Sequence, residues 1–260
     1  MSNKLVSNPA NSDDDVTIYS IEMCPFAQRS RILLDLKQVE HDLVEIDITK
    51  PRPDWFLELN PAGKVPVITH RGKAINESSV INEYLEDVFS DPPVFPEDPY
   101  LRAQARILVD YCNKRFTPNM YRVLMEQDEA KRGRVEKAAS EDWLWLEEYL
   151  RRRPPDGDFI LGDFGIVDLT FAPFFERYVL NKYFWGFELP NGVERVVQWM
   201  DAVLEYPAVK RTRFSEEDYI KLYADYALGF ANGAVPPGHE RSSSDLTVPL
   251  AERPMPPRRR

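Results

Sequence analysis

Hydrophobic positions in the N-terminal part of the chain alternate between strand-like and helix-like spacing. Residues 16–20 alternate and are β-branched, which is typical of a strand. Ile32 and Leu33 share one face of a helix, and we expect Arg29 and Lys37 to lie outside this apolar face. Further elements are predicted in this order: a strand at 43–47, a short helix near Trp55, strands at 65–69 and 74–75, and a helix from Glu77. Together they predict one α/β layer made of a βαβ unit, a hairpin and a helix.

The C-terminal part of the chain has helical periodicity almost throughout. Its pattern predicts an all-α domain with helices at 101–114, 130–151, 167–180, 193–205 and 215–226. A proline-rich connector precedes this domain, and a segment rich in Pro, Ser and Gly follows it. We expect that tail to be either disordered or an extended strap over a surface. The predicted division is a disordered N-terminus at 1–14, an α/β domain at 15–90, a linker at 91–99, a helical domain at 100–230 and the tail at 231–260.

Composition excludes several classes of function. With 43% hydrophobic and 29% charged residues, the 260-residue chain has the composition of a soluble globular protein. No apolar run is long enough to span a bilayer or to direct export, and two distant cysteines predict no disulfide framework, so we expect a cytoplasmic protein without a membrane partner. A net charge of −10 argues against nucleic acid as a partner, although Arg151–Arg153 form a short basic run. The three histidines, His41, His70 and His239, lack metal-ligand spacing, so no metal site is expected.

The strongest chemical signal is Cys24, which lies where the first strand runs into the first helix. Pro25 suits the first helical position, where its missing N–H costs nothing. Cys24 would then occupy the helix cap and face unpaired backbone N–H groups, an environment that favours a thiolate. The alternative is a buried structural cysteine, since free cysteines are commonly buried.

The residue three positions after Cys24 decides between two kinds of thiol chemistry. A dithiol redox motif would carry a second cysteine there, and this chain has Ala27. Without a resolving thiol nearby, Cys24 can exchange only with an external thiol. The sequence therefore predicts monothiol chemistry with a small-molecule thiol. The other cysteine, Cys112, lies in an apolar helical stretch and is expected to pack inertly.

This combination of a strand–Cys–Pro–helix motif, a proline-rich linker and an all-helical second domain resembles the glutathione S-transferase family. The resemblance implies an α/β plus all-α fold, with an N-terminal thioredoxin-like domain that binds glutathione and a C-terminal all-helical domain that binds the second substrate. It also implies glutathione as co-substrate and a homodimer. Asp168 is similar to the family's structural capping aspartate, but Gly165 stands where Ser or Thr is usual.

The family's glutathione contacts can be followed along the first domain. The run at 60–66 resembles the segment with a cis-proline, which implies that Val65, before Pro66, pairs its backbone with the cysteinyl part of glutathione. The pair Glu77-Ser78 resembles the site for the γ-glutamyl end at a helix N-terminus. The alternatives are an ordinary turn and a simple helix cap. The resemblance extends the set of glutathione-binding residues to Pro25, Phe26, Arg52 and Lys64.

Within the family, Cys-Pro-Phe-Ala and the run at 50–56 are similar to the omega class. Arg52 falls where that class carries a lysine that contacts glutathione. The positive charge is kept, but the planar guanidinium, unlike an ammonium group, implies a different contact geometry. The runs at 50–55, 222–226 and 253–258 further resemble omega-type glutathione lyases of sphingomonad lignin β-aryl-ether breakdown. Such enzymes remove glutathione from α-thioether ketones.

The resemblance implies a two-step exchange. The Cys24 thiolate would attack the glutathione sulfur of an α-glutathionyl aromatic ketone, and a second glutathione would resolve the mixed disulfide. Tyr226 would supply the proton or hydrogen bond that the leaving enolate needs, and Tyr223, Tyr111 and Tyr121 would line or support the aromatic pocket. The alternative for these tyrosines is packing of an amphipathic helix.

Three other functions remain open. A thioltransferase or dehydroascorbate reductase would use Cys24 in the same way without needing Tyr226. A conjugating transferase is disfavoured, because a reactive cysteine traps glutathione as a disulfide. A silent binding protein would have no need of Cys24, Val65-Pro66 and Glu77-Ser78 together.

Overall fold

The computed structural model describes residues 15–153 and 157–259. By its internal contacts the chain divides into two compact units, Met1–Pro92 and Pro93–Arg260, which are described separately. The predicted disorder at 1–14 lies outside the described residues.

The first unit is built on a mixed four-stranded sheet with the strand order β2-β1-β3-β4. β1 pairs in parallel with β2 and antiparallel with β3, and β3 pairs antiparallel with β4. The strands are β1 (Val16–Ser20), β2 (His41–Glu45), β3 (Val67–His70) and β4 (Lys73–Asn76). The parallel pair needs a crossover connection, and the helix after β1 supplies it. This is the α/β layer that the pattern predicted.

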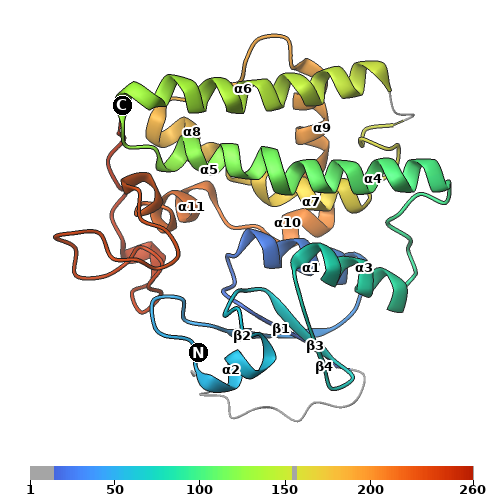
Figure 1. Cartoon of the computed structure of the whole chain (residues 1–260), viewed down its shortest axis with the longest axis horizontal. Helices are drawn as coiled ribbons and strands as arrows, with labels where there is room; N and C mark the ends of the chain where they lie inside the picture. Colours follow the sequence, from blue (N-terminus) through green and yellow to red (C-terminus); the bar gives the residue numbers. More distant parts are fainter. Residues whose placement is uncertain (1–14, 154–156, 260) are drawn as a thin grey trace. The chain divides into compact units, whose positions relative to one another are not determined.

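Three helices cover the sheet of the first unit. α1 (Pro25–Leu36) and α3 (Ser78–Val88) lie on one face, and the short α2 (Asp54–Leu59) lies on the other (Figure 1). Ile32 and Leu33 of α1 are fully buried, as the spacing predicted. On the opposite face Phe56 of α2 packs with Tyr19 and Val67 into a small core. The sheet is therefore covered on both faces, and its first strand ends directly at α1.

Arg29 of α1 and Lys37, the C-cap of that helix, are buried, which corrects the expectation that they lie outside the apolar face. The Lys37 ammonium group pairs with the Glu86 carboxylate at 2.6 Å and donates to the Pro92 carbonyl at 2.8 Å. Helical spacing alone missed this because both faces of α1 have neighbours in the fold: one faces the sheet and another faces α3.

The second unit is helical, in agreement with the predicted fold class. In the described residues its helices are α4 (Pro99–Tyr111), the π-helical η1 (Cys112–Phe116), α5 (Thr117–Met125), α6 (Glu129–Arg152), α7 (Ile166–Glu176), α8 (Tyr178–Trp185), α9 (Glu194–Glu205), α10 (Pro207–Thr212) and α11 (Glu216–Leu222), with short 3₁₀ turns η2 (Tyr226–Leu228) and η3 (Leu250–Glu252). Its core is aromatic, with Phe116, Trp143, Phe171, Phe175 and Trp199 in mutual ring contact.

The helix predicted at 101–114 does not simply end but passes through a π-helical turn into α5. Pro118 explains the irregularity, because its nitrogen carries no hydrogen and cannot donate to the preceding turn. Cys112 opens the π turn and is fully buried, with its Sγ 3.6 Å from the Thr117 hydroxyl oxygen. Its burial agrees with a packing role.

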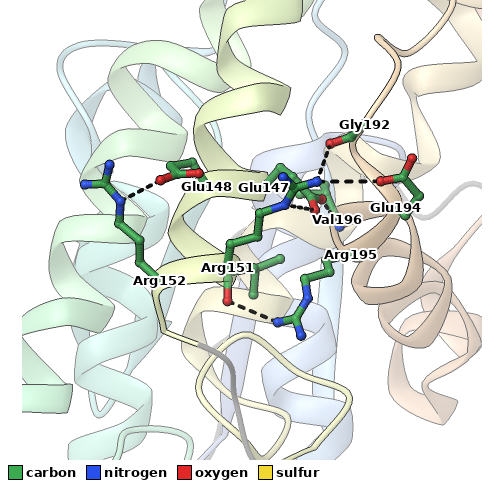
Figure 2. Close-up of polar contacts among 9 residues, drawn as sticks. Glu147, Glu148, Arg151, Arg152, Gly192, Glu194, Arg195 and Val196 are labelled. Atoms are coloured by element: carbon green, nitrogen blue, oxygen red, sulfur yellow. Dashed lines mark hydrogen bonds and ion pairs between the residues drawn. The ribbon is translucent and has the colours of Figure 1, made fainter.

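The basic run at the end of α6 is neutralised by carboxylates of its own surroundings. Figure 2 shows Arg151 between Glu147, at 3.0 Å on the same helix, and Glu194, at 3.8 Å on α9. Arg152 pairs with Glu148 at 2.6 Å. These pairs engage Arg151 and Arg152, while the Arg153 guanidinium lies over the Tyr149 ring.

The C-terminal tail is an irregular strap on the second unit, beside α8 and α11 (Figure 1). The Tyr183 hydroxyl donates to the Pro256 carbonyl at 2.6 Å, and the Arg259 N–H donates to the Phe184 carbonyl at 2.9 Å. Lys221 of α11 donates to the Leu250 carbonyl at 3.0 Å. Of the two expectations for the tail, the strap describes its residues up to 259.

Within residues 15–153 and 157–259, no helix combines the length and the apolar character that crossing a membrane requires. The same residues hold no group of three or more His, Cys, Asp or Glu side chains placed to share a metal ion.

Candidate functional site

Cys24 lies at the junction of β1 and α1, at the N-cap of the helix. Its backbone is extended, with φ −63° and ψ 122°, and Pro25 begins the helix as its spacing predicted. The Cys24 carbonyl accepts the first helical hydrogen bond, from the Gln28 N–H at 2.9 Å. The side chain is only 7% exposed. Cys24 therefore holds the cap position of α1, and its side chain makes no capping hydrogen bond to the backbone amides that open the helix.

Arg29 links two of the predicted site residues and was missed by the sequence analysis. Its guanidinium donates to the Ser78 hydroxyl at 3.2 Å, and its central carbon lies 5.2 Å from the centre of the Phe26 ring. Arg29 is 1% exposed, so a positive charge is held in the interior beside the first turn of α3. Because Ser78 opens α3, a carboxylate near it would meet a helix N-terminus and a nearby cation.

Glu77 holds an unusual backbone conformation immediately before Ser78. Its φ is 66° and its ψ is 110°, and it is the N-cap of α3. A positive φ costs a residue with a Cβ atom of order 1–3 kcal/mol and is found most often where function requires it. The turn from β4 into α3 therefore carries backbone strain at Glu77, directly before Ser78.

The Val65-Pro66 peptide bond is cis, as the resemblance implied, and directly precedes β3. Asn60 organises the loop before it. The Asn60 amide donates to the Lys64 carbonyl at 2.8 Å, and its oxygen accepts the Ala62 N–H at 3.2 Å. This loop brings Lys64 and Val65 to the start of a central strand. Asn60 was not singled out from the sequence, and the family-like run at 60–66 was the available signal.

Arg52 braces the loop before α2. Its guanidinium donates to three backbone carbonyls, of Asp47 at 3.2 Å, Lys50 at 3.0 Å and Gly63 at 3.1 Å. A lysine has a single charged nitrogen and could not hold these directions with the same fixed fork. Arg52, which stands where the omega class carries a lysine, therefore ties together the loops before and after α2.

In the second unit Tyr121, Tyr223 and Tyr226 form an aromatic cluster. The Tyr223 ring lies 4.8 Å from the ring of Tyr226 and 6.4 Å from that of Tyr121, measured between ring centres. The hydroxyl oxygens of Tyr121 and Tyr223 are 3.4 Å apart. Arg177, buried and not singled out from the sequence, donates to the Tyr223 hydroxyl at 2.9 Å. Burial, reinforced by Tyr223, raises the pKa of Tyr121 well above its usual value, so Tyr121 stays protonated.

Tyr226 is not in a helix, which corrects the prediction of a continuous helix at 215–226. α11 ends at Leu222, and Tyr226 begins the 3₁₀ turn η2. The Tyr226 hydroxyl accepts the Asn232 N–H at 3.2 Å. The Tyr226 ring lies 5.9 Å from the Tyr121 ring between ring centres, and its closeness to Tyr223 agrees with the i, i+3 spacing of the two residues.

Tyr111 has different partners from the tyrosine cluster. Its ring stacks on Trp145 with 3.9 Å between ring centres, and its hydroxyl donates to the Asp142 carboxylate at 2.7 Å. Burial and Asp142 together raise the pKa of Tyr111 above its usual value. These contacts connect α4 to α6.

The predicted residues thus form two groups. The first unit holds the cap of α1, the loop before β3 and the start of α3, with Arg29 linking α1 to Ser78, and the second unit brings together three of the four predicted tyrosines. The family description "Glutathione S-transferase, N-terminal domain" matches residues 23–88, which contain the whole first group.

Two kinds of comparison extend this match beyond the first unit. "Glutathione S-transferase U19" of Arabidopsis thaliana is 31% identical over 190 residues, which cover 72% of this chain and 84% of the relative. The chain belongs to the glutathione S-transferase family. Its fold is similar to the crystal structure of glutathione transferase Omega 3C from Trametes versicolor, with a TM-score of 0.72, 30% identity, and coverage of 84% of this chain and 91% of the other.

A second similar structure was solved with glutathione bound. Rice GST1 (OsGSTU1), solved in complex with glutathione, has a TM-score of 0.73 and 26% identity to this chain, with coverage of 84% of this chain and 97% of the other. Both structures support a thioredoxin-like N-terminal domain followed by a helical domain as the architecture of this family member.

Proposed function

We propose that this family member is an omega-type enzyme in which Cys24 removes glutathione from α-glutathionyl aromatic ketones. The observation that carries the proposal is the placement of Cys24 at the N-cap of α1, before Pro25 and without a second cysteine at position 27. A thiol in this place is suited to attack sulfur and cannot close an internal disulfide with its own motif. The similarity to an omega transferase of known structure supports the class.

Glutathione is the proposed co-substrate. The Val65 backbone before the cis-proline would pair with its cysteinyl part, and the α3 N-terminus at Glu77 and Ser78 would receive its γ-glutamyl carboxylate. The buried Arg29 adds positive charge behind Ser78. The remaining proposed contacts come from Pro25, Phe26, Arg52 and Lys64.

The proposed reaction has two exchanges. The Cys24 thiolate attacks the glutathione sulfur of the substrate, and the sulfur–carbon bond breaks with its electron pair going to the carbon next to the carbonyl. The resulting enolate takes a proton, with Tyr226 as the proposed donor and Tyr223 and Tyr121 beside it. A second glutathione thiolate then attacks the mixed disulfide, which releases glutathione disulfide and restores the Cys24 thiolate.

Turnover of an aromatic α-glutathionyl ketone in the presence of glutathione tests the proposal. We expect the free ketone and glutathione disulfide to form in equal amounts, Cys24→Ala to abolish turnover, and Tyr226→Phe to lower kcat by about 10-fold or more. Tyr100→Phe, at an exposed tyrosine of α4 outside the cluster, is the control.

Two other outcomes identify the competing functions. If the ketone is untouched while simple glutathione mixed disulfides are reduced through Cys24, the protein is a general thioltransferase or dehydroascorbate reductase. If Cys24→Ala changes no activity, a non-catalytic binding protein is the better description.

A further inference from the structure

The segment that carries Tyr223 and Tyr226 leaves helical geometry between the two tyrosines. α11 ends at Leu222, and the next regular turn begins at Tyr226. In a continuous α-helix the Asp225 N–H would donate to the carbonyl four residues earlier. Here it donates to the hydroxyl of Ser243, in the C-terminal tail, at 3.2 Å.

Ser243 supplies the hydrogen-bond partners that residues after the end of α11 lack. Its hydroxyl donates to the Leu222 carbonyl at 2.7 Å while accepting the Asp225 N–H. Its backbone N–H donates to the Asp225 carboxylate, which is 3% exposed. One tail residue therefore satisfies a carbonyl, an amide and a buried carboxylate of the segment 222–226, all of which would be costly to leave unpaired.

Arg253 holds Ser243 in place from further along the tail. Its guanidinium donates to the Ser243 carbonyl at 2.7 Å, to the Val248 carbonyl at 2.7 Å and to the Asp245 carbonyl. These bonds close the loop 243–253 on itself, so that the Ser243 hydroxyl is presented from a braced loop and not from a loose end.

The end of α11 also contacts the tail directly. The Lys221 ammonium group adds one more bond, to the Leu250 carbonyl at 3.0 Å. The bonds of Ser243 and of Lys221 join the tail to residues 221–225, and those of Arg253 lie within the tail.

We infer that Ser243 and Arg253 are positioning residues: through the tail they fix the backbone between Tyr223 and Tyr226 and so set the orientation of the aromatic-substrate pocket. The inference rests on the proposed function for its consequence in catalysis, but the hydrogen bonds that carry it involve neither Cys24 nor glutathione. Removing the Ser243 hydroxyl would release the Leu222 carbonyl and the Asp225 N–H, although the Ser243 N–H would still bind the Asp225 carboxylate, and the tyrosines would sample other directions.

The test compares the full-length wild type with Ser243→Ala, Ser243→Thr and Ser244→Ala. Thr keeps the hydroxyl, and Ser244 is the matched control because its hydroxyl makes none of the described bonds to 222–226. Three readouts are taken: hydrogen exchange of the Asp225 amide, affinity for an aromatic ketone without glutathione, and turnover of the glutathionyl ketone. Reduction of a simple glutathione mixed disulfide serves as the reference for Cys24.

For Ser243→Ala we expect exchange at Asp225 to become about 10-fold faster, and ketone affinity and kcat to fall by roughly 3- to 10-fold, the range of one lost hydrogen bond. Disulfide reduction is expected to stay unchanged, Ser243→Thr to recover most of the loss, and Ser244→Ala to behave as wild type. Arg253→Ala should repeat the Ser243→Ala pattern, since it releases the same loop.

Unchanged exchange at Asp225 in Ser243→Ala would overturn the inference, and so would faster exchange with unchanged ketone affinity and kcat. If the wild type binds the ketone but does not turn over its glutathionyl form, the proposed reaction fails. Weaker ketone binding by Ser243→Ala would then still support the positioning role, and equal binding would refute it.

Discussion

At the scale of single residues, Gly165 departs from the family pattern for a reason that lies in another segment. The position usually holds Ser or Thr as a helix cap, but a Cβ atom here would come within 2.7 Å of the Val94 carbonyl oxygen. That oxygen already accepts the Ile166 N–H at 2.9 Å. The linker, at Val94, therefore occupies the space that a capping side chain would need.

Gly165→Ser should destabilise the protein even though it restores the usual capping residue. Overpacking of this kind costs about 1–3 kcal/mol. Gly133→Ala is the control, because Gly133 lies inside α6 with open space around its Cβ position, and alanine there should stabilise by about 0.5–1 kcal/mol. Urea unfolding of both variants measures the two changes. A stabilised Gly165→Ser protein would mean that the Val94 segment moves aside at little cost.

Some site residues could be predicted from the sequence and others could not. Cys24, Pro25 and the cis bond before Pro66 follow from local patterns, since a cap, a first helical position and a family-like run each lie within a few consecutive residues. Arg29 and Arg177 do not, because their roles come from partners far along the chain, Ser78 and Tyr223. A buried arginine has the same sequence signature as an exposed one.

At the scale of elements, the start of α7 depends on a buried carboxylate. Asp168 accepts hydrogen bonds from the Gly165 N–H at 2.8 Å and the Trp199 indole at 2.6 Å. Burial raises the pKa of Asp168 from 3.8 to about 6, although these bonds oppose the shift. The carboxyl thus joins α7 to α9 while its ionised form is disfavoured by burial.

The free energy of unfolding should therefore depend on pH through Asp168. Because the pKa in the folded state is above the unfolded value, the folded state binds the proton more tightly, and this contribution is fully present below the unfolded pKa. It falls as the pH rises through about 6, by about 3 kcal/mol in total. Asp168→Asn cannot titrate, so the stability difference between wild type and Asp168→Asn should shrink between about pH 4 and 7. A difference independent of pH would show that Asp168 stays ionised in the folded protein.

The bounds of some helices and strands were predicted better than those of others from the hydrophobic pattern. β1 and α6 lie close to their predicted bounds, because β-branched residues mark the strand and a long helical period marks the helix. The helix predicted at 215–226 was too long, because its end is set by Ser243 in the tail. A helix end that depends on a distant partner leaves no signal in the local pattern.

At the scale of the whole molecule, the two-unit architecture was predictable, since a change from mixed to helical periodicity at a proline-rich connector is a strong signal. The surface of the second unit carries exposed apolar side chains that helical periodicity alone did not identify. Ile107 of α4 and Leu144 and Trp145 of α6 are 53%, 43% and 39% exposed. α4 and α6 are neighbours, because Tyr111 stacks on Trp145. Exposed apolar side chains on adjacent helices are typical of a surface that another chain covers.

We propose this α4–α6 surface as part of the homodimer contact that the family resemblance implies. Ile107→Asp should weaken the dimer at least about 100-fold, because an unpaired carboxylate buried in an interface costs several kcal/mol. Its exposure in the single chain predicts that the fold survives, which circular dichroism checks. Val235→Asp, at an exposed apolar position in the tail, is the control and should leave the dimer intact. Sedimentation over a range of concentrations separates the results. A monomeric wild type would refute the dimer, and a dimeric Ile107→Asp protein of undiminished affinity would place the contact on another face.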